Sequence, residues 1–344
     1  MDNQSNENKK MKAVIATKYG HPEVLKLIEI EKPQLKEDEV LIRNYGSSIN
    51  TVDIIARSGK APRVIFWGMR QLIGPFLRLS FGGFRKPNQK IPVGFGFAGE
   101  IESVGKEVKT DWKAGDHVYG YSEKGGACAE YLTVPTSQLA RKPANLSFQE
   151  AAAVPGGSSP ALLAFRDLAQ PKKGQKVLVI GASGGIGSFG VQMAKLYGAE
   201  VTGVCGPTNI DMVKEIGADH VIDYTKEDYT KNDQKFDIIF DAIGANTLSK
   251  CKKILTDKGS YVSNNFLNSP RHIFQLMTNR FRKKKLKFGV ADEGVDNLNL
   301  LREWIENGKI KPVIDTVYPL NQTADAQRHY ETGHSKGRVV ISID

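Results

Sequence analysis

The sequence predicts an α/β protein that combines a doubly wound parallel sheet with a second, β-rich domain. The chain has 344 residues, which exceeds one typical domain and makes two domains the expectation. Apolar and β-branched runs separated by glycine and proline occupy the N-terminal part, for example at residues 12–16, 25–29 and 39–44, as expected of strands and turns. After residue 176, strand-like and helix-like segments alternate, which is typical of a parallel sheet covered by helices.

Residues 176–198, KVLVIGASGGIGSFGVQMAKLYG, have the pattern of a strand, a glycine turn and a helix. A second apolar strand over residues 201–205 follows at the distance that a βαβ unit needs. The turn suits a pyrophosphate, because glycine lets the backbone approach the ligand and the helix amides face its negative charge. The alternative is a tight turn that binds nothing. The residues predicted to contact a dinucleotide here are Ser183, Gly184, Gly185 and Ile186.

The composition is typical of a soluble globular protein, with 40% hydrophobic and 25% charged residues. No apolar run approaches the roughly 20 residues that a membrane span requires. The N-terminus is polar and lacks the apolar core of a secretory signal, so we expect a cytoplasmic location. Cys128, Cys205 and Cys251 form no CxxC pair, which fits a reducing compartment and argues against a disulfide framework or a cysteine-rich zinc site.

The formal net charge of +10 raises the question of an anionic partner. One dense basic run carries much of this charge and consists of Arg280, Arg282, Lys283, Lys284, Lys285 and Lys287. The run lacks a recognisable nucleic-acid motif. We therefore favour a solvated loop or a phosphate-attracting surface, and we do not expect nucleic acid to be a partner.

Residues 47–60, SSINTVDIIARSGK, interrupt an apolar sequence with Asn50 and Asp53. Here the chain resembles the medium-chain dehydrogenase/reductase superfamily, in its zinc-free quinone oxidoreductase-like branch of NADP-dependent alcohol dehydrogenase-like proteins. The resemblance covers nearly the whole chain. It implies a GroES-like β-rich catalytic domain over residues 1–154 and 310–344, and a Rossmann dinucleotide-binding domain over residues 155–309.

Asn50 stands where this branch typically carries an asparagine near the nicotinamide and the substrate, so the resemblance implies that Asn50 is catalytic. The zinc alcohol dehydrogenases carry a cysteine ligand at this position. The alternative from the residues alone is that Asn50 caps the helix that follows. The two interpretations are compatible.

Residues 61–91 carry apolar residues among regularly placed arginines and form a segment longer than the matching loop of a minimal quinone oxidoreductase. Three interpretations compete for this segment: a lid over an apolar substrate pocket, a subunit contact, and a membrane-surface patch.

The chain lacks the metal ligands at every position where the resemblance would place them. In residues 92–105, PVGFGFAGEIESVG, the zinc enzymes have a His-Glu pair, whereas this chain has Phe95 and Gly96. The histidines form no spaced ligand set either. We therefore expect no catalytic zinc. We interpret His117 and Cys128 as structural residues, because neither has a sequence-adjacent catalytic partner.

The resemblance also locates the contact with the nicotinamide ribose, where the family usually has a threonine. This chain has Pro160 at that position, in GGSSPALLAF, and Ser159 is the best substitute. At the family turn over residues 241–244, which follows a strand at its ligand-binding end, Ala242 and Gly244 are the predicted cofactor contacts.

The end of the second strand of the βαβ unit decides the choice between NAD and NADP. An NAD enzyme of this fold commonly has an acidic residue there, which bonds the ribose 2′-hydroxyl and repels a 2′-phosphate. This chain has no acid there. Its candidate contacts are Cys205, Gly206, Thr208 and Asn209, and Tyr224 resembles a family tyrosine that lies against the adenosine phosphate. NADPH is therefore favoured over NADH. The alternative is that Thr208 and Asn209 cap the next helix.

The remaining elements continue the doubly wound pattern. Strands are expected at residues 220–222, 236–240, 260–263 and 286–290, and helices at residues 246–255 and 297–307. Residues 314–344 resemble the superfamily's C-terminal return into the first domain. The resemblance also implies a homodimer through strand pairing at the sheet edge near Tyr261.

Without a zinc ion to activate an alcohol, an electron-poor acceptor takes hydride more easily. The leading hypothesis is therefore the NADPH-dependent reduction of a quinone or an α,β-unsaturated carbonyl compound, a small apolar substrate. Asn50 would bond the oxygen that gains charge. Tyr121 and bulk water are candidates for the proton donor.

Two alternatives remain open at this stage. One is a zinc-free carbonyl reductase or alcohol dehydrogenase that uses a protein acid. The other is a nucleotide-bound protein that binds RNA or membranes through its basic surface and has little catalytic activity.

Overall fold

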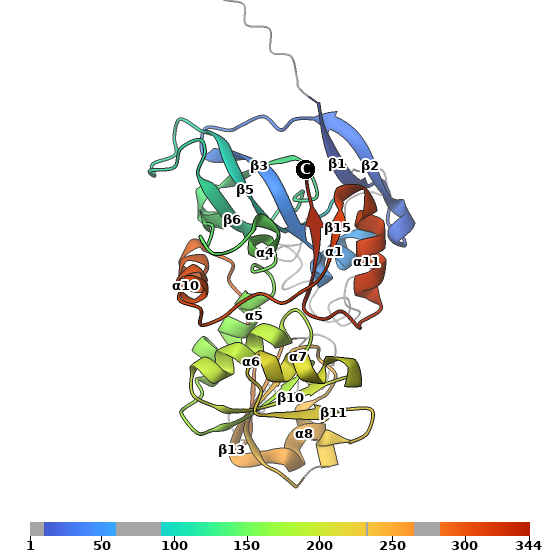
Figure 1. Ribbon diagram of the computed structural model, residues 1–344, viewed down its shortest axis with the longest axis vertical. Coiled ribbons are helices and arrows are strands. Elements are labelled where there is room, and N and C mark those ends of the chain that lie inside the picture. The colour runs from blue at the N-terminus through green and yellow to red at the C-terminus, as the bar shows by residue number, and fades with distance from the viewer. Residues whose placement is uncertain (1–9, 60–90, 232, 265–282) are drawn as a thin grey trace, which may run out of the picture.

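The computed structural model describes residues 10–59, 91–231, 233–264 and 283–344. The segment at residues 61–91, apart from its last residue, lies outside the described residues, and so do Arg280 and Arg282 of the basic run. Figure 1 shows two lobes stacked along the long axis, each built around its own sheet.

Among the described residues, six parallel strands form one sheet in the order β11-β10-β9-β12-β13-β14, which we call the parallel sheet. Its strands are β9 (Lys176–Ile180), β10 (Glu200–Cys205), β11 (His220–Asp223), β12 (Phe236–Asp241), β13 (Leu255–Ser263) and β14 (Lys285–Lys287). The glycine turn leads from β9 into α6 (Gly187–Leu196), and Gly198 after this helix has a φ of 78°, the left-handed conformation of a helix end. This arrangement confirms the predicted strand, turn and helix.

Alternating residues of β9 pack against opposite faces of the parallel sheet. Val177 and Val179 belong to the core on one face, together with side chains of α6. Leu178 and Ile180 belong to the core on the other face, together with side chains of α8 (Leu248–Cys251). A strand that is apolar on both sides is expected where helices cover both faces of a parallel sheet. The α/β, doubly wound fold class is therefore confirmed.

Several further helices belong to the lobe of the parallel sheet or join it to the rest of the chain. They are α5 (Ser158–Leu162), the π-helix η3 (Leu163–Ala169), η4 (Pro207–Asn209), α7 (Ile210–Glu215), η5 (Tyr229–Lys231), η6 (Lys252–Ile254) and α10 (Val295–Glu306). The helix expected at residues 246–255 is shorter in the structure, because β13 already begins at Leu255.

A second sheet, which we call the mixed sheet, contains seven of the described strands. They are β3 (Glu39–Ser48), β5 (Gly96–Val104), β6 (His117–Tyr121), β7 (Tyr131–Pro135), β8 (Leu139–Arg141), β15 (Ile314–Pro319) and β16 (Arg338–Ser342). The C-terminal strand β16 runs antiparallel to β3, so the C-terminal segment returns to the sheet that the N-terminal part of the chain begins.

A smaller sheet and several helices complete this lobe. The smaller sheet contains β1 (Lys10–Ala16), β2 (Leu25–Glu31) and β4 (Ile91–Pro92). The helices are η1 (Pro22–Val24), α1 (Thr51–Ser58), η2 (Thr136–Gln138), α4 (Phe148–Ala152), η9 (Leu320–Gln322) and α11 (Thr323–Glu331).

Tyr261, which is expected near the edge of the parallel sheet, lies one strand inside the outermost described strand and pairs with Leu286 of β14. Tyr261 is on β13, which is flanked by β12 and β14, and its side chain is fully buried. Its hydroxyl donates to Asp241 Oδ2 over 2.7 Å. The short strand β14 adds to the sheet beyond β13 and is the outermost of the described strands on this side, so Tyr261 is a core residue.

Candidate active site

The glycine turn between β9 and α6 brings the backbone close to the position where a ligand would lie. Gly181 has a φ of 76°, and a Cβ on Gly187 would lie 2.0 Å from the Gly181 carbonyl oxygen, so neither position accepts a side chain without strain. A Cβ on Gly184 would contact only that same oxygen, at 3.5 Å. The turn therefore leaves space for a ligand beside Gly184. This space lies next to the first backbone N–H groups of α6, a ten-residue helix.

The predicted cofactor contacts lie at the carboxyl ends of four adjacent strands. Ser183, Gly184, Gly185 and Ile186 follow β9; Cys205, Gly206, Thr208 and Asn209 lie at or after the end of β10; Tyr224 follows β11; and Ala242 and Gly244 follow β12. Asn209 Nδ2 donates to Ser183 Oγ over 3.1 Å and so bonds the second loop to the glycine turn. The fold thus brings these residues to the edge where such sheets bind ligands.

The end of β10 carries no carboxylate that points toward the turn. Thr208 Oγ1 donates to Asn209 Oδ1 over 3.3 Å, and neither Asn209 nor Gly206 caps its helix with a side chain. Strand register pairs Cys205 with Asp223 of β11, but Asp223 Oδ1 accepts from Thr225 N and Oγ1 at 2.9 and 2.7 Å. Oδ1 is therefore bonded within its own turn, whereas the buried Oδ2 has no hydrogen-bond partner among the described residues.

Tyr224 lies beside Gly206, at the end of the second strand. A Cβ on Gly206 would be 3.4 Å from the Tyr224 hydroxyl oxygen, and the Tyr224 side chain is 51% exposed. An aromatic ring with one free face is suited to lie against a flat or phosphorylated group.

Asn50 is the N-cap residue of α1, but its side chain does not form the cap bond. Its amide oxygen Oδ1 accepts from Arg338 Nη2 over 2.5 Å, and its Nδ2 donates to the Ser48 carbonyl oxygen over 3.0 Å. The cap comes from Asp53, whose Oδ2 accepts from Asn50 N at 2.8 Å. Because a guanidinium only donates, the bond to Arg338 fixes which end of the amide is the oxygen and leaves one Nδ2 hydrogen available.

Arg338 is a residue of this site that the sequence analysis missed. It is the first residue of β16 and only 3% exposed. Besides Asn50, its Nη2 donates to Ser48 Oγ at 3.1 Å and to the Pro155 carbonyl oxygen at 3.3 Å. Burial lowers the pKa of Arg338, although a guanidinium stays charged at neutral pH. An arginine at the start of an otherwise apolar strand, GRVVIS, was the signal in the sequence.

Arg338 also contacts the glycine turn. A Cβ on Gly185 would lie 2.6 Å from Arg338 Cδ and 3.1 Å from its Nη1. Gly337 N donates to the Ser183 carbonyl oxygen over 2.7 Å, which bonds the start of β16 to the same turn. Within the described ranges, the buried Nε of Arg338 has no hydrogen-bond partner. A cation with an unused donor therefore lies between Asn50 and the predicted pyrophosphate site.

Ser159 lies in the first turn of α5 and is bonded to a carboxyl group that the sequence analysis also missed. Ser159 Oγ donates to Glu293 Oε2 over 2.6 Å, and Gly156 N donates to Glu293 Oε1 over 3.1 Å. Glu293 lies between β14 and α10 and is partly buried. Its only sequence signal was an acidic pair, DEG, shortly after the strand expected at residues 286–290.

Tyr121, which is half-buried, and Cys128, which is buried, have little acid reactivity at neutral pH. Burial raises the pKa of Tyr121 well above its ordinary value, and its ring stacks on Phe95 with centroids 5.7 Å apart. Burial likewise raises the pKa of the Cys128 thiol, which lies 3.8 Å from Ser47 Oγ. Cys128 is thus a packing residue, in agreement with its interpretation from the sequence.

The comparisons with known proteins identify the family. The alcohol dehydrogenase GroES-like domain model matches residues 36–144, and the zinc-binding dehydrogenase model matches residues 216–341. The chain is 34% identical to an NADPH-dependent alkenal/one oxidoreductase of Arabidopsis thaliana, over 97% of this chain and 80% of that protein. It is also 34% identical to a 2-methylene-furan-3-one reductase of Solanum lycopersicum, over 96% and 79% of the two chains. The chain belongs to the medium-chain dehydrogenase/reductase superfamily.

Solved structures agree with this assignment. The structure of a quinone oxidoreductase from Coxiella burnetii superimposes with a TM-score of 0.83 at 25% identity, over 98% of this chain and all of that one. This medium-chain dehydrogenase/reductase therefore belongs to the quinone oxidoreductase-like branch, with a GroES-like domain and a Rossmann-type parallel sheet, as the sequence resemblance implied.

The described part of this medium-chain dehydrogenase/reductase contains no group of three or more His, Cys, Asp or Glu side chains that could hold a metal ion. Phe95 and Gly96 lie in or next to β5, and Phe95 packs on Tyr121. The absence of zinc stays a prediction from the sequence.

None of the helices in the described ranges has the length and apolarity that crossing a bilayer demands.

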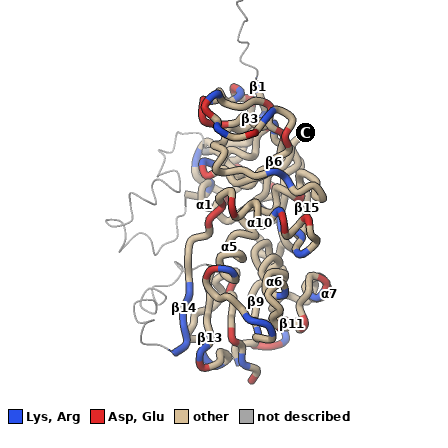
Figure 2. Tube along the Cα trace, turned by 90° about the vertical axis from the view of Figure 1, so that its left-hand side faces the viewer, with Lys and Arg blue, Asp and Glu red and all other residues tan. Residues whose placement is uncertain are grey.

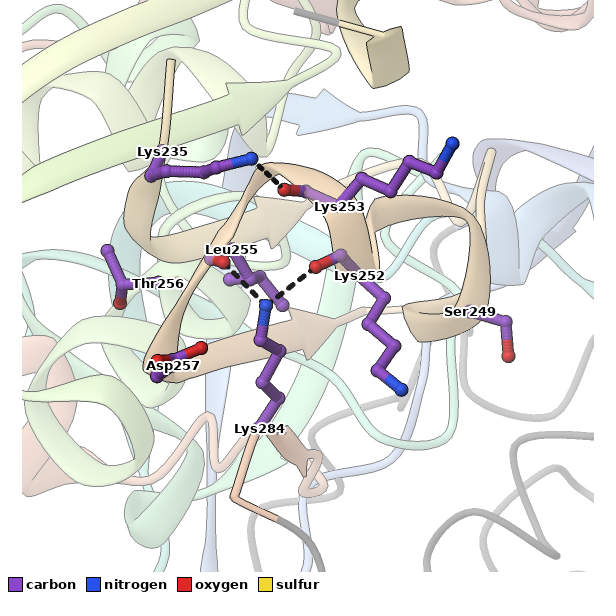
Figure 3. Close-up of a pocket in the computed structure, with 8 residues that line it drawn as sticks. All are labelled: Lys235, Ser249, Lys252, Lys253, Leu255, Thr256, Asp257 and Lys284. Carbon is purple, nitrogen blue, oxygen red and sulfur yellow. Dashed lines mark hydrogen bonds between the residues drawn. The ribbon is translucent and has the colours of Figure 1, made fainter. Parts of the chain in front are cut away.

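A basic surface pocket of about 680 Å³ lies at the opposite end of the parallel sheet, where β12 and β13 begin (Figure 3). Two of its lysines bond backbone: Lys284 Nζ donates to the carbonyl oxygens of Lys252 and Leu255, and Lys235 Nζ donates to that of Lys253. Lysines gather on β14 in Figure 2, and Lys287 Nζ also donates to a carbonyl oxygen, that of Leu168. These bonds give Lys284 and Lys287 of the basic run a structural role.

Proposed function

We propose that this protein reduces α,β-unsaturated carbonyl compounds or quinones with NADPH as the hydride donor. The protein is an oxidoreductase, and the names of its relatives, an NADPH-dependent alkenal/one oxidoreductase and a quinone oxidoreductase, support this substrate class. The observation that carries the proposal is the buried Asn50 amide, which Arg338 holds next to the glycine turn.

The residues present fit a dinucleotide. The glycine turn leaves space beside Gly184, and Arg338 has an unused donor next to Gly185 among the described contacts. The proposed cofactor contacts are those predicted from the sequence: Ser159, Ser183, Gly184, Gly185, Ile186, Cys205, Gly206, Thr208, Asn209, Tyr224, Ala242 and Gly244. When bound, the reduced nicotinamide supplies a hydride. NADPH is favoured over NADH because residues 205–209, at the end of β10, include no acidic residue that would repel a 2′-phosphate.

Asn50 provides a hydrogen-bond donor for the substrate. The oxygen of an enone or quinone gains negative charge as the acceptor is reduced, and a preorganised donor stabilises that charge. The second Nδ2 hydrogen of Asn50 is this donor, since the first bonds Ser48. Arg338 strengthens it, because a buried cation on the amide oxygen draws electron density away from Nδ2.

The two other functions are less favoured. A zinc-free carbonyl reductase would use the same cofactor site, but the names of the relatives point to enones and quinones. An RNA- or membrane-binding protein would need the basic run to be free, whereas Lys284 and Lys287 bond backbone carbonyl oxygens. The homodimer, the domain boundaries and the cytoplasmic location stay predictions.

Oxidation of NADPH and NADH is the test, measured against quinones, enones, simple aldehydes and simple ketones, with and without a chelator. We expect turnover of enones or quinones with NADPH that a chelator does not change. Turnover confined to simple aldehydes and ketones would favour the carbonyl reductase. NADPH binding without turnover of any acceptor would refute the proposed function.

A further inference from the structure

Glu293 joins the loop before α10 to the start of α5. Its Oε2 accepts from Ser159 Oγ over 2.6 Å, and its Oε1 accepts from Gly156 N over 3.1 Å. Ser159 is the residue that the sequence analysis predicts at the nicotinamide ribose. The Glu293 carboxyl group therefore lies one hydroxyl group away from the proposed cofactor site.

Gly156 places this carboxyl group next to the proposed substrate donor. Gly156 has a φ of 72°, and a Cβ in this position would lie 2.5 Å from Asn50 Oδ1 and 3.3 Å from Tyr121 Cε2. Asn50, Tyr121 and Glu293 therefore converge on one residue, which has no side chain to separate them. Three polar side chains from three different elements meet here.

The surroundings of Glu293 favour a bound proton. Glu293 interacts electrostatically with four titratable side chains. They are Asp292 in its own loop, Tyr119 and Tyr121 of β6, and Arg338 of β16. Burial is the largest effect and raises the pKa of Glu293, whereas the bonds from Ser159 and Gly156 and the charge of Arg338 oppose this rise. None of the ion pairs among the described residues involves Glu293, so no cation of this part of the chain lies within 4.0 Å of its carboxyl group to hold it ionised.

Asp53, the other carboxyl group near Asn50, is held differently. Its two oxygens accept from the backbone N–H groups of Asn50 and Gly94, at 2.8 and 2.6 Å. A backbone amide does not exchange a proton with a carboxyl group, whereas a serine hydroxyl can take one proton and give up another. Glu293 has such a hydroxyl partner, whereas Asp53 interacts with backbone N–H groups and with the Asn50 amide, none of which relays a proton.

We propose that the Glu293 carboxyl group holds the proton that this active site delivers to its substrate, and that the Ser159 hydroxyl passes it on. Gly156 N donates to Oε1, so the proton is on Oε2. With this proton in place, the bond between Oε2 and Ser159 Oγ reverses the direction that it has for an ionised carboxylate. Oε2 donates, Ser159 Oγ accepts, and the serine hydrogen is free to donate away from Glu293. This role rests on the proposed reduction of enones.

The reduction of an enone requires one hydride and one proton. The hydride comes from a reduced nicotinamide dinucleotide, which is thereby oxidised, and it forms a C–H bond at the β carbon. The π electron pair of the C=C bond moves toward the α carbon and the carbonyl oxygen. The proton of Ser159 then forms the C–H bond at the α carbon, Ser159 takes the proton of Glu293, and water reprotonates the Glu293 carboxylate.

The first test measures the proton on Glu293 in the cofactor-free protein. With ¹³C-labelled glutamate, NMR records the chemical shifts of the side-chain carboxyl carbons as a function of pH. The wild type is compared with Glu293→Gln and with a control, Glu303→Gln, whose residue lies on the exposed side of α10. We expect one carboxyl group to titrate above the usual glutamate value of about 4.3, and its signal to vanish only in Glu293→Gln. The same set of titrations in all three proteins would overturn the proposal.

The second test follows delivery of the proton, with an enone in D₂O. The wild type should place deuterium on one face of the α carbon. Glu293→Gln and Ser159→Ala should slow enone reduction by about 10²-fold or more and lose this stereochemistry. Ser159→Ala should keep the Glu293 titration. The rate of quinone reduction should fall less, because the oxygen of a reduced quinone accepts a proton from water quickly.

The outcomes separate the two proposals. Wild-type stereochemistry and rate in Glu293→Gln, with enones still reduced, would overturn the role of Glu293 and leave the proposed function intact. Absence of enone turnover in the wild type would refute the proposed function, and with it the delivery step, while the NMR titration would still show whether Glu293 holds a proton.

Discussion

Arg338 Nη2 donates to Asn50 Oδ1 over 2.5 Å, although the two residues are 288 positions apart in the sequence. The bond joins the first residue of the C-terminal strand to the N-cap of α1, and the same guanidinium packs on Gly185 of the glycine turn. Arg338 thus couples the proposed substrate donor to the proposed cofactor site.

Arg338→Met should lower both stability and activity. The variant keeps an unbranched apolar stem but leaves the buried oxygens of Asn50 and Pro155 without their donor, at about 1–3 kcal/mol for each unsatisfied group. The Asn50 amide would also lose its fixed orientation, so kcat should fall more than the affinity for NADPH. Urea denaturation and steady-state kinetics measure the two effects.

Arg328→Met is the matched control for this variant. Arg328 is half-exposed on α11 and pairs with Glu23 and Asp325 on the surface. Loss of an exposed ion pair should change the free energy of unfolding by no more than about 1 kcal/mol. Equal stability of the two variants would contradict the role given to Arg338.

Asn50→Asp should separate the two functions of the Asn50 amide. A carboxylate still accepts from Arg338, but it cannot donate to a substrate oxygen. Turnover of enones should fall by about 10²–10³-fold, as for other lost oxyanion donors, while cofactor binding measured by NADPH fluorescence changes little. Unchanged turnover would remove Asn50 from the mechanism, and Thr51→Ala at the next position, which is exposed, serves as the control.

Gly156→Ala should damage the site beyond its backbone strain. The new Cβ would lie 2.5 Å from Asn50 Oδ1, in addition to the cost of about 1–2 kcal/mol for a side chain at positive φ. Gly174→Ala is a control for the strain alone, because Gly174 has a φ of 81° and a Cβ there meets nothing within 4 Å.

Backbone strain should therefore lower the unfolding temperature of the two glycine variants by similar amounts. Gly156→Ala should show an additional decrease. Activity should fall only in Gly156→Ala. Full activity in Gly156→Ala would show that Asn50 does not need its present position.

Gly206→Asp should weaken NADPH binding and spare NADH. A Cβ at Gly206 has room, 3.4 Å from the Tyr224 hydroxyl oxygen, and a carboxylate at this strand end repels a 2′-phosphate. We expect the ratio of the two dissociation constants to change by about tenfold or more, which corresponds to about 1.4 kcal/mol. Gly206→Asn has the same size without the charge. An equal effect of both substitutions would argue for steric hindrance instead.

Asp53 should make the free energy of unfolding decrease as the pH rises from 4 to 6. Burial raises the pKa of Asp53 to about 6 in the folded protein, against about 3.9 for an unperturbed aspartate. The proton is thus bound more tightly in the folded state, so the stabilisation is complete below pH 4 and is lost as pH rises through 6. The difference amounts to about 3 kcal/mol.

This pH dependence is measured as the free energy of unfolding of the wild type minus that of Asp53→Asn, from pH 4 to pH 8. The difference should shift in favour of the variant by about 3 kcal/mol as pH rises. The unpaired backbone N–H group in the variant adds a constant offset that does not depend on pH. A difference that is flat across the range would contradict the buried, proton-binding state of Asp53.

The sequence by itself determined the local elements and the positions of the cofactor loops. The glycine turn after β9 and the continuous burial of residues 177–180 follow from residues that are neighbours in the chain, so the local pattern predicts them. The expected contacts at the ends of β9 to β12 lie on adjacent strands because parallel connections bring carboxyl ends together. The family resemblance added Asn50.

Only the tertiary structure decided what surrounds these residues. The bonds from Arg338 to Asn50 and from Ser159 to Glu293 join segments 288 and 134 positions apart, and neither spacing nor composition encodes such a pairing. The same holds for Tyr261, which became a core residue because β14 pairs beyond β13. Local patterns specify which face of an element is apolar, whereas packing of distant elements decides which polar groups are buried together and hence how their charges and protons are shared.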